Sequence, residues 1–286
     1  MDRLDAIYYR VKNELKYVKK TVQLMWDKEQ KSVLNENTRF HNLHKGQRCF
    51  IVGNGPSLRE LDLSFISDEL VFTVNYFPKS PLYKVVRSNY HILMDPLIFD
   101  FTSIHKGERL QLLHQVASIE KPPICFAQYN IKKRVEDSGV NKMMQFYYVN
   151  SGLGIYDGYK RKFNLTKVSP GFSNVVLYAT MLAMYMGVED IYYIGCDMTG
   201  YEQFSLKAGK KVEYHVYEAN AKDREMMLAQ VNDLRGEAFF EGFYHMFREY
   251  RLLNDYANKQ GVHLYNATKG GVLDSIERVD YESLFK

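Results

Sequence analysis

Short apolar runs recur along the chain from about residue 48 to the C-terminus, separated by longer amphipathic stretches. The runs are rich in Val, Ile, Tyr and Phe and do not alternate strictly with polar residues, which is the pattern of strands buried on both faces of a sheet. The expected strands cover residues 49–52, 71–74, 91–94, 123–127, 145–148, 190–194 and 263–265.

The amphipathic stretches carry apolar residues three and four positions apart, as do helices that cover a sheet. The expected helices cover residues 58–65, 81–87, 107–119, 130–137, 173–186, 223–235 and 242–259. Strands that alternate with helices predict an α/β fold, here a Rossmann-like, mainly parallel sheet with helices on both faces. Such sheets bind ligands beyond the carboxyl ends of their strands, so the residues that follow each strand are the first candidates for a site.

Residues 3–31 contain neither Gly nor Pro and predict one long amphipathic helix. Its apolar positions are Leu4, Ile7, Val11, Leu15, Val18, Val22 and Met25, and its other faces are basic. Such a helix suits three roles equally well: it can lie on an anionic membrane surface, pair with a second copy of the chain as a homo-oligomer, or pack on the domain.

Changes of pattern along the chain predict its division into parts. We expect an N-terminal helical extension over residues 1–45, an α/β core over residues 46–197 that is completed by residues 242–286, and a lid insertion over residues 198–241. The lid is expected because a long connection with few apolar periods inside a compact domain is usually functional.

Composition narrows the class of protein. The net charge of +4 comes from 38 Lys and Arg against 34 Asp and Glu, without the clustered excess of a nucleic-acid binder, so no nucleic-acid partner is expected. The three cysteines, Cys49, Cys125 and Cys196, are too widely spaced for a disulfide framework or a zinc motif. No apolar run approaches the ~20 residues of a membrane span. We therefore expect a cytoplasmic protein.

Two glycines follow the first expected strand in the sequence Gly53-Asn54-Gly55-Pro56-Ser57. Glycines let bare backbone approach a ligand, and the start of the following helix offers free amides to a phosphate. The dinucleotide fingerprint is not present because Leu58 replaces its third glycine, and no Walker lysine follows. A purely structural turn is the alternative.

Polar side chains also follow other strands, namely Asn75, Asp95 and Asp197. An amide or a carboxylate at a strand end can hold the hydroxyls of a ligand or can organise its own loop. Ser173 or Asn174 can cap the helix that follows them, and the same residues can contact a ligand. No second acidic residue lies close to Asp197 in the sequence, so no metal site is expected.

Two histidines are the best candidates for proton transfer, because imidazole titrates near neutral pH. His215 lies in the segment EYHVYE and His245 in GFYHMF. A histidine beside aromatic residues is more often structural, and that interpretation stands beside the catalytic one.

The strand-end segments in their order, IVGNGPSL, FTVNYF, ILMDPLIF, SPGFSNVV and VEDIYYIGCDM, resemble the metal-independent bacterial sialyltransferases of glycosyltransferase family 42, which use CMP-sialic acid. The same order resembles a related group, named after 6-hydroxymethylpterin diphosphokinase, that includes flagellin-glycosylating proteins. The C-terminal segment YNATKGGVLDSIERVDYESLF is similar to the end of that group. The resemblance runs from about residue 48 to the C-terminus.

The resemblance implies a glycosyltransferase that moves a sialic acid-like sugar, of nonulosonic or Kdo type, from a CMP-sugar donor to a glycan or glycolipid acceptor with inversion and without metal or cofactor. The context it implies is lipopolysaccharide or capsule synthesis, in the cytoplasm at the inner face of the cell membrane. The nucleotide site would comprise Gly53, Asn54, Gly55, Pro56, Ser57, Asn75, Asp95, Ser173, Asn174 and Asp197. A lid histidine, His215 or His245, would act as the base, with Tyr201, Tyr214 and Tyr217 facing the departing phosphate.

Two other functions fit the sequence. One is a pterin diphosphokinase-like enzyme, which would need ATP, Mg²⁺ and carboxylates to bind the ion, and only Asp95 and Asp197 are well placed for that role. The other is a non-catalytic nucleotide-sugar-binding protein that serves in assembly.

Overall fold

The computed structural model describes residues 3–102, 105–213, 215–217 and 221–286. These residues contain one nine-stranded sheet in the order β6-β5-β4-β3-β2-β1-β7-β8-β9, in which all neighbouring strands are parallel. The strands are β1 (Arg48–Val52), β2 (Leu70–Val74), β3 (Tyr90–Leu93), β4 (Ile124–Gln128), β5 (Phe146–Gly154), β6 (Val168–Gly171), β7 (Asp190–Ile194), β8 (His263–Asn266) and β9 (Glu277–Arg278).

The direction of winding reverses at β1. The chain steps outward from β1 to β6, then crosses back to form β7 on the other side of β1 and continues to β8. Val52 pairs with Ile194, so the loops that follow β1 and β7 leave the sheet side by side. A reversal of this kind opens a crevice at the carboxyl ends of the two strands, which is where ligands of open α/β sheets bind.

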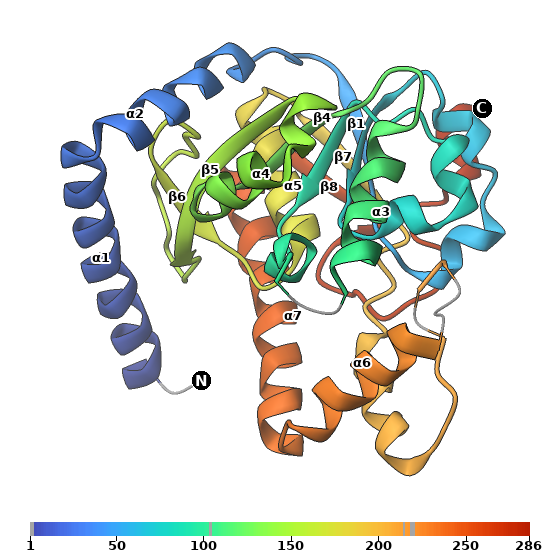
Figure 1. The fold of residues 1–286 in the computed structure, drawn as a ribbon. Coiled ribbons are helices and arrows are strands. Elements are labelled where there is room, and N and C mark those ends of the chain that lie inside the picture. The colour runs from blue at the N-terminus through green and yellow to red at the C-terminus, as the bar shows by residue number, and fades with distance from the viewer. Residues whose placement is uncertain (1–2, 103–104, 214, 218–220) are drawn as a thin grey trace.

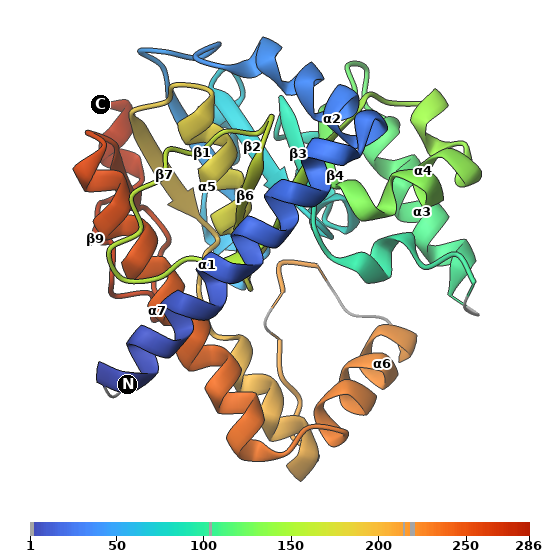
Figure 2. The ribbon, with the colours of Figure 1, turned by 90° about the vertical axis from the view of Figure 1, so that its left-hand side faces the viewer.

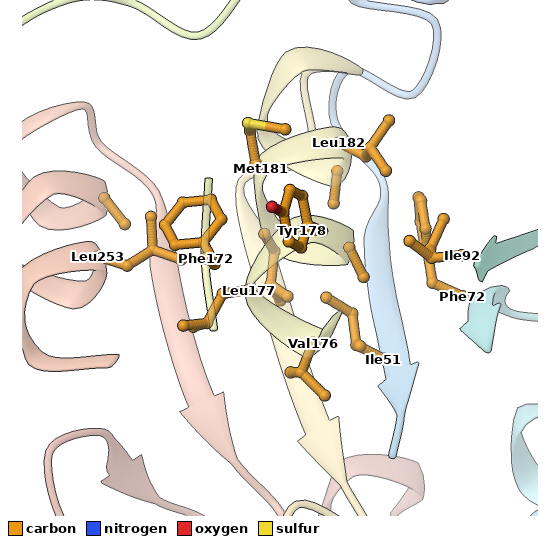
Figure 3. Close-up of a cluster of buried hydrophobic side chains, with 14 of the residues drawn as sticks. Ile51, Phe72, Ile92, Phe172, Val176, Leu177, Tyr178, Met181, Leu182 and Leu253 are labelled. Carbon is orange, nitrogen blue, oxygen red and sulfur yellow. The ribbon is translucent and has the colours of Figure 1, made fainter. Parts of the chain in front are cut away.

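Helices cover both faces of the sheet, as the alternation of strands and helices predicts. On one face α5 (Val175–Tyr185) and α7 (Gly236–Lys259) pack on inward-facing residues such as Ile51 and Phe72. Figure 3 shows Val176, Leu177 and Leu182 of α5 beside these strands. The other face is covered by α3 (Lys106–Ala117) and α4 (Lys132–Ser138). The expected fold class is therefore confirmed.

All seven expected strands are present, and two strands were missed. Strand β6 has the sequence VSPG, whose proline and glycine argue against a strand. It lies at one edge of the sheet, where a missing N–H is tolerated. Strand β9, with the sequence ER, is two residues long and forms the other edge. Neither strand carries an apolar run, so the hydrophobic pattern could not reveal them.

Five of the expected core helices are confirmed as α3, α4, α5, α6 (Ala221–Asn232) and α7, and α7 begins at Gly236, ahead of the expected residue 242. Two expectations were wrong. Residues 58–65 form two 3₁₀ helices, Pro56–Glu60 and Leu63–Ile66, because the Asp62 side chain accepts from the backbone N–H of Ser64 and starts a new turn. Residues 81–87 form only a 3₁₀ helix, Pro81–Lys84, capped by Ser80.

The expected helix over residues 3–31 is broken in two. Helix α1 (Arg3–Trp26) ends before Asp27, whose side chain caps α2 (Lys28–Asn35) by accepting from the backbone N–H of Gln30. Both helices pack beside β5 at one end of the sheet (Figures 1 and 2). Within the described residues, no helix combines the length and the apolar character that crossing a membrane requires.

The segment expected to be a lid, residues 198–241, contains a 3₁₀ helix over Gly200–Ala208, the whole of α6 and the beginning of α7. Figure 1 shows α6 and the first turns of α7 beyond the sheet, on the side away from α2. The division of the chain into extension, core and lid stays a prediction.

Candidate functional site

The glycine turn after β1 fits against the end of β7. The backbone N–H of Gly53 donates to Ile194 and that of Gly55 donates to Gly195, both at 2.8 Å. A Cβ atom on Gly55 would lie 1.7 Å from Asp197 Oδ2, and one on Gly53 would lie 2.3 Å from the Gly195 carbonyl oxygen. The close approach of the two loops therefore requires both glycines, and this structural requirement holds with or without a bound ligand.

Asp197 organises the same turn. Its carboxylate accepts from the Ser57 hydroxyl at 2.7 Å and from the Ser57 backbone N–H at 3.2 Å. Burial raises the pKa of Asp197, and the two bonds from Ser57 oppose that shift. Pro56 is the first residue of a 3₁₀ helix rather than of the α-helix expected there. The bonds between Ser57 and Asp197 give both residues a structural role, and their contact with a nucleotide stays a prediction.

Asn54, between the two glycines, has a buried amide oxygen at the strand end. Its Nδ2 group donates to the Val74 carbonyl oxygen at 3.4 Å, while its Oδ1 atom accepts no hydrogen bond from the described residues. A buried amide oxygen that lacks a donor costs free energy, so such an atom at a strand end suits a ligand that supplies the donor.

Two neighbouring cavities at the carboxyl ends of the strands share one wall. The first, of about 230 Å³, lies between the glycine turn, the start of α5 and residues of α7. The second, of about 310 Å³, lies beyond the ends of β2 and β3. Asn54, Gln203 and His215 line both. The lid segment thus places an imidazole between two compartments of one crevice.

Asn75 and Asp95 line the second cavity and hold its loops in place. The Asn75 Oδ1 atom accepts from the backbone N–H of Met94 at 3.0 Å, and the Asn75 backbone has a left-handed φ of 40°. Asp95 accepts from the hydroxyl of Tyr76 at 2.9 Å and from the N–H of Leu97 at 2.9 Å. Two effects raise the pKa of Tyr76: burial is the larger, and the negative charge of Asp95 is the second. The hydroxyl of Tyr76 therefore stays neutral and can donate a hydrogen bond.

His215 is held over the glycine turn by backbone contacts. The N–H of Val216 donates to the Asn54 carbonyl oxygen at 2.7 Å, and Arg59 donates to the carbonyl oxygens of His215 and Val216 at 3.2 and 3.1 Å. The imidazole stacks on Tyr217, with ring centroids 4.7 Å apart. Tyr217 is buried and also lines the second cavity, whereas Tyr214 lies outside the described residues.

His245 and Tyr201 do not line either cavity in the described part of the chain. His245 lies on α7, and its Nε2 atom is 3.5 Å from Glu241. Tyr201 belongs to the 3₁₀ helix Gly200–Ala208 and packs edge-on against Phe243. Of the two candidate bases, His215 is the one that lies at the strand ends.

Asn174 is the N-cap of α5, as expected, because its Oδ1 atom accepts from the N–H of Val176 at 2.8 Å. It also lines the first cavity. Ser173 is bound instead to Glu249 of α7, which accepts from its hydroxyl at 2.6 Å and from its N–H at 2.8 Å. The predicted contact of Ser173 with a nucleotide would therefore have to replace its hydrogen bonds to Glu249.

Sequence reasoning missed several residues of the second cavity, and two of them are cationic. Lys79 lies over the rings of Tyr76 and Tyr217, and Arg109 is ion-paired with Asp100 at 2.9 Å. Lys79 follows β2 in the segment NYFPKS, so a wider view of that strand end could have found it. Arg109 lies on α3 and carries no local signal.

Grouped metal ligands are not found at this site. In the described residues, His, Cys, Asp and Glu do not gather in threes or more in a way that could hold a metal ion. Asp95 and Asp197 line different parts of the crevice, and each already accepts hydrogen bonds from neighbouring residues.

No family model and no curated protein matches this chain. Two solved structures, both of the sialyltransferase CstII from Campylobacter jejuni, are similar to it. The one in complex with the substrate analogue CMP-3FNeuAc is 17% identical over 81% of this chain and 86% of that chain, with a TM-score of 0.48. The one with cytidine-5'-monophosphate is 14% identical over 83% and 88%, with a TM-score of 0.42. A likeness this distant assigns neither an activity nor site residues to this chain.

Proposed function

We propose that this protein is a glycosyltransferase that moves a sialic acid-like sugar, of nonulosonic or Kdo type, from a CMP-sugar to a hydroxyl of a glycan or glycolipid. The observation that carries the proposal is the position of His215 and Asn54 in the wall shared by the two cavities at the strand ends. A transferase needs a nucleotide compartment and a sugar compartment that meet at the reacting bond. The order of strand-end motifs that resembles family 42 supports the same function.

In this proposal the nucleoside occupies the first cavity and the sugar the second. The buried Oδ1 atom of Asn54 accepts from the nucleotide. Lys79 and Arg109 line the second cavity together with the acidic Asp95 and Glu108, and we propose that the two cations bind the carboxylate of a nonulosonic sugar. The sugar carboxylate is the feature that distinguishes these donors from neutral nucleotide sugars.

The reaction then proceeds by inversion. The bond between the anomeric carbon and the phosphate oxygen breaks, and CMP leaves with the electron pair. The acceptor oxygen forms the new bond from the opposite face, and His215 takes its proton, a contribution of typically ~10²–10⁴ in rate. The hydroxyl of Tyr217, which lines the second cavity, is proposed to donate to the departing phosphate, with Tyr214 as a second candidate, whereas Tyr201 packs on Phe243 outside both cavities. Neither a metal nor a cofactor is part of this proposal.

The proposed setting is the synthesis of lipopolysaccharide, capsule or another surface glycan, in the cytoplasm at the inner face of the cell membrane. This setting follows from the resemblance and from the need of such enzymes for a cytoplasmic CMP-sugar pool and a glycolipid acceptor.

Thermal unfolding with CMP, CDP and ATP, each with and without Mg²⁺, tests the proposal. A ligand that binds the folded state stabilises it by about 2.7 kcal/mol at 100 times its Kd. We expect CMP to raise the melting temperature without Mg²⁺. A rise with Mg-ATP alone would favour the diphosphokinase alternative and overturn the proposal, and binding of CMP without transfer from any CMP-sugar would favour a binding protein.

A matched pair of variants locates the site in the same experiment. Asn54→Ala removes the buried acceptor and should weaken CMP binding by about tenfold or more, since a hydrogen bond of this kind contributes ~1–3 kcal/mol. Asn258→Ala, at an exposed position near the end of α7, should leave CMP binding unchanged.

A further inference from the structure

Helix α1 has two faces with different surroundings. One face packs on the domain: Asn13 and Leu24 are buried, Glu14 is ion-paired with Arg161, and Lys20 donates to the Ser151 carbonyl oxygen. The opposite face is apolar and exposed. Its large apolar side chains are Ile7 (52% exposed), Tyr8 (67%), Val11 (50%), Leu15 (67%), Val18 (57%), Val22 (47%), Met25 (69%) and Trp26 (83%). Figure 2 shows α1 crossing this side of the molecule with no other described element in front of it.

The exposed positions follow a seven-residue repeat. From Tyr8 to Met25 the intervals between successive apolar residues are three, four, three, four and three, so that Tyr8, Leu15 and Val22 take the a positions and Val11, Val18 and Met25 the d positions. A repeat of 3.5 residues is the signature of a helix whose apolar seam faces another helix. We call these six residues the seam.

The residues beside the seam are largely polar, which favours a protein partner over a bilayer. The e positions hold Lys12, Lys19 and Trp26, and the g positions hold Ile7, Glu14 and Thr21, so that four of the six are polar. A helix that lies in a membrane surface needs a wider apolar face than two positions in seven. The narrow seam bordered by polar side chains is the pattern of a coiled coil.

We propose that α1 pairs in parallel with α1 of a second copy of this chain, through the seam. Parallel pairing places Lys19 of each chain beside Glu14 of the other, whose carboxylate is also ion-paired with Arg161 of its own chain, because g and e positions five residues apart meet across such a dimer. Antiparallel pairing in register would place Lys12 opposite Lys19 twice. The charges therefore select the parallel arrangement.

The exposed area is sufficient for a stable pair. Each seam residue is about half exposed or more. Together with Ile7 and Trp26, the seam can bury on the order of 800 Å² per chain, which matches a standard interface. The domain lies on the face of α1 opposite the seam, so pairing leaves the two domains on opposite outer sides. Lys20 and Gln23 of α1 also line a cavity of about 450 Å³ beside Asp95.

The mass of the full-length protein in solution tests the proposal independently of any activity. Sedimentation or light scattering should give twice the chain mass of 33.6 kDa at micromolar concentration. The double variant L15E/V18E should be monomeric with an unchanged circular dichroism spectrum, because both side chains are exposed. Lys16→Glu, at an exposed position of the same helix outside the seam, should remain dimeric. A monomeric wild-type protein would overturn the proposal, as would a dimer that survives in L15E/V18E.

Disulfide formation tests the orientation. The native cysteines are buried, so an introduced cysteine is the accessible thiol. Val18→Cys should form a disulfide between two chains under mild oxidation, since parallel d positions face each other, while Lys16→Cys should not. Crosslinking only between Leu15→Cys and Val18→Cys chains would contradict the parallel arrangement. A monomeric protein that sediments with phosphatidylglycerol vesicles would assign the seam to lipid instead.

Discussion

The backbone N–H of Val216 donates to the carbonyl oxygen of Asn54 at 2.7 Å, and this bond joins the segment predicted to be a lid to the glycine turn that follows β1. Arg59 reinforces it from the 3₁₀ helix that follows the turn, through bonds to the two neighbouring carbonyl oxygens of the lid segment. The position of His215 thus depends on contacts between parts of the chain about 160 residues apart.

Arg59→Ala should loosen this segment. The ion pair of Arg59 with Glu213 is exposed and contributes little, so the free energy of unfolding should fall by only about 1 kcal/mol. Hydrogen exchange at Val216 should become faster. Arg87→Ala is the control, because Arg87 is exposed and lies 3.8 Å from Asp68, far from the lid segment in the fold. Equal exchange at Val216 in both variants would show that Arg59 does not hold the lid.

The two histidines should differ in their effect on catalysis. Under the proposed mechanism, His215→Ala lowers kcat by ~10²–10⁴ and removes the acid limb of the pH profile of kcat. His245→Ala should change kcat less than about threefold, since it contacts Glu241 rather than the cavities. Steady-state kinetics with a CMP-sugar decides between them, and a larger loss in His245→Ala would reverse the assignment.

Gly55→Ala should destabilise the fold. The added methyl group would overlap Asp197 Oδ2 and approach the Gly195 carbonyl oxygen, so we expect the free energy of unfolding to fall by about 2–3 kcal/mol. Gly242→Ala is the matched control. Apart from the backbone of α7 itself, no atom of the described residues lies within 4 Å of a Cβ at Gly242, and alanine should stabilise that helix by about 0.5–1 kcal/mol. Urea unfolding measures both changes, and opposite signs are expected.

His91 should make stability depend on pH. It is buried beneath the Asn75 turn, where Nε2 donates to the Asn75 carbonyl oxygen at 3.1 Å and Nδ1 accepts from the Thr73 hydroxyl at 2.8 Å. Burial lowers the pKa of His91 from 6.5 to about 3. Between these two pH values the unfolded chain binds a proton at His91 that the folded chain does not bind. The free energy of unfolding is therefore highest above pH 6.5, as far as His91 is concerned, and decreases as the pH falls toward 3.

The measurement is the free energy of unfolding at several pH values in that window. His91 alone should make the free energy of unfolding change by up to about 1.4 kcal/mol per pH unit in this window. His91→Gln should reduce the slope, while His263→Gln, at an exposed position on β8, should leave it unchanged. An equal slope in His91→Gln and the wild type would mean that the imidazole is protonated in the folded state.

The sequence alone revealed the core of the sheet but not its edges. Strands such as β1 and β2 are buried along almost their whole length, so each needs a continuous apolar run that can be recognised locally. The helix expected over residues 58–65 failed because Asp62 prefers to cap a new turn, a choice between competing local bonds that apolar spacing does not report.

For the site, too, the sequence revealed some residues and not others. The residues at the strand ends, from Asn54 to Asp197, could be named in advance, because the carboxyl ends of parallel strands meet at one edge of a sheet. The sequence left the choice between His215 and His245 open, and it gave no sign of Arg109. Those positions depend on how the lid segment and α3 pack on the core.

The sequence by itself determined that a tight glycine turn follows a buried strand, and that an apolar stripe with intervals of three and four residues runs along the N-terminal helix. Only the tertiary structure decided what those features face. The glycines face Gly195 and Asp197 because β1 pairs with β7, some 140 residues later, and the seam faces solvent because the opposite side of α1 is held by the domain. A local pattern reports the shape that a segment can adopt, whereas its neighbours are selected by burial and hydrogen bonding summed over the whole chain.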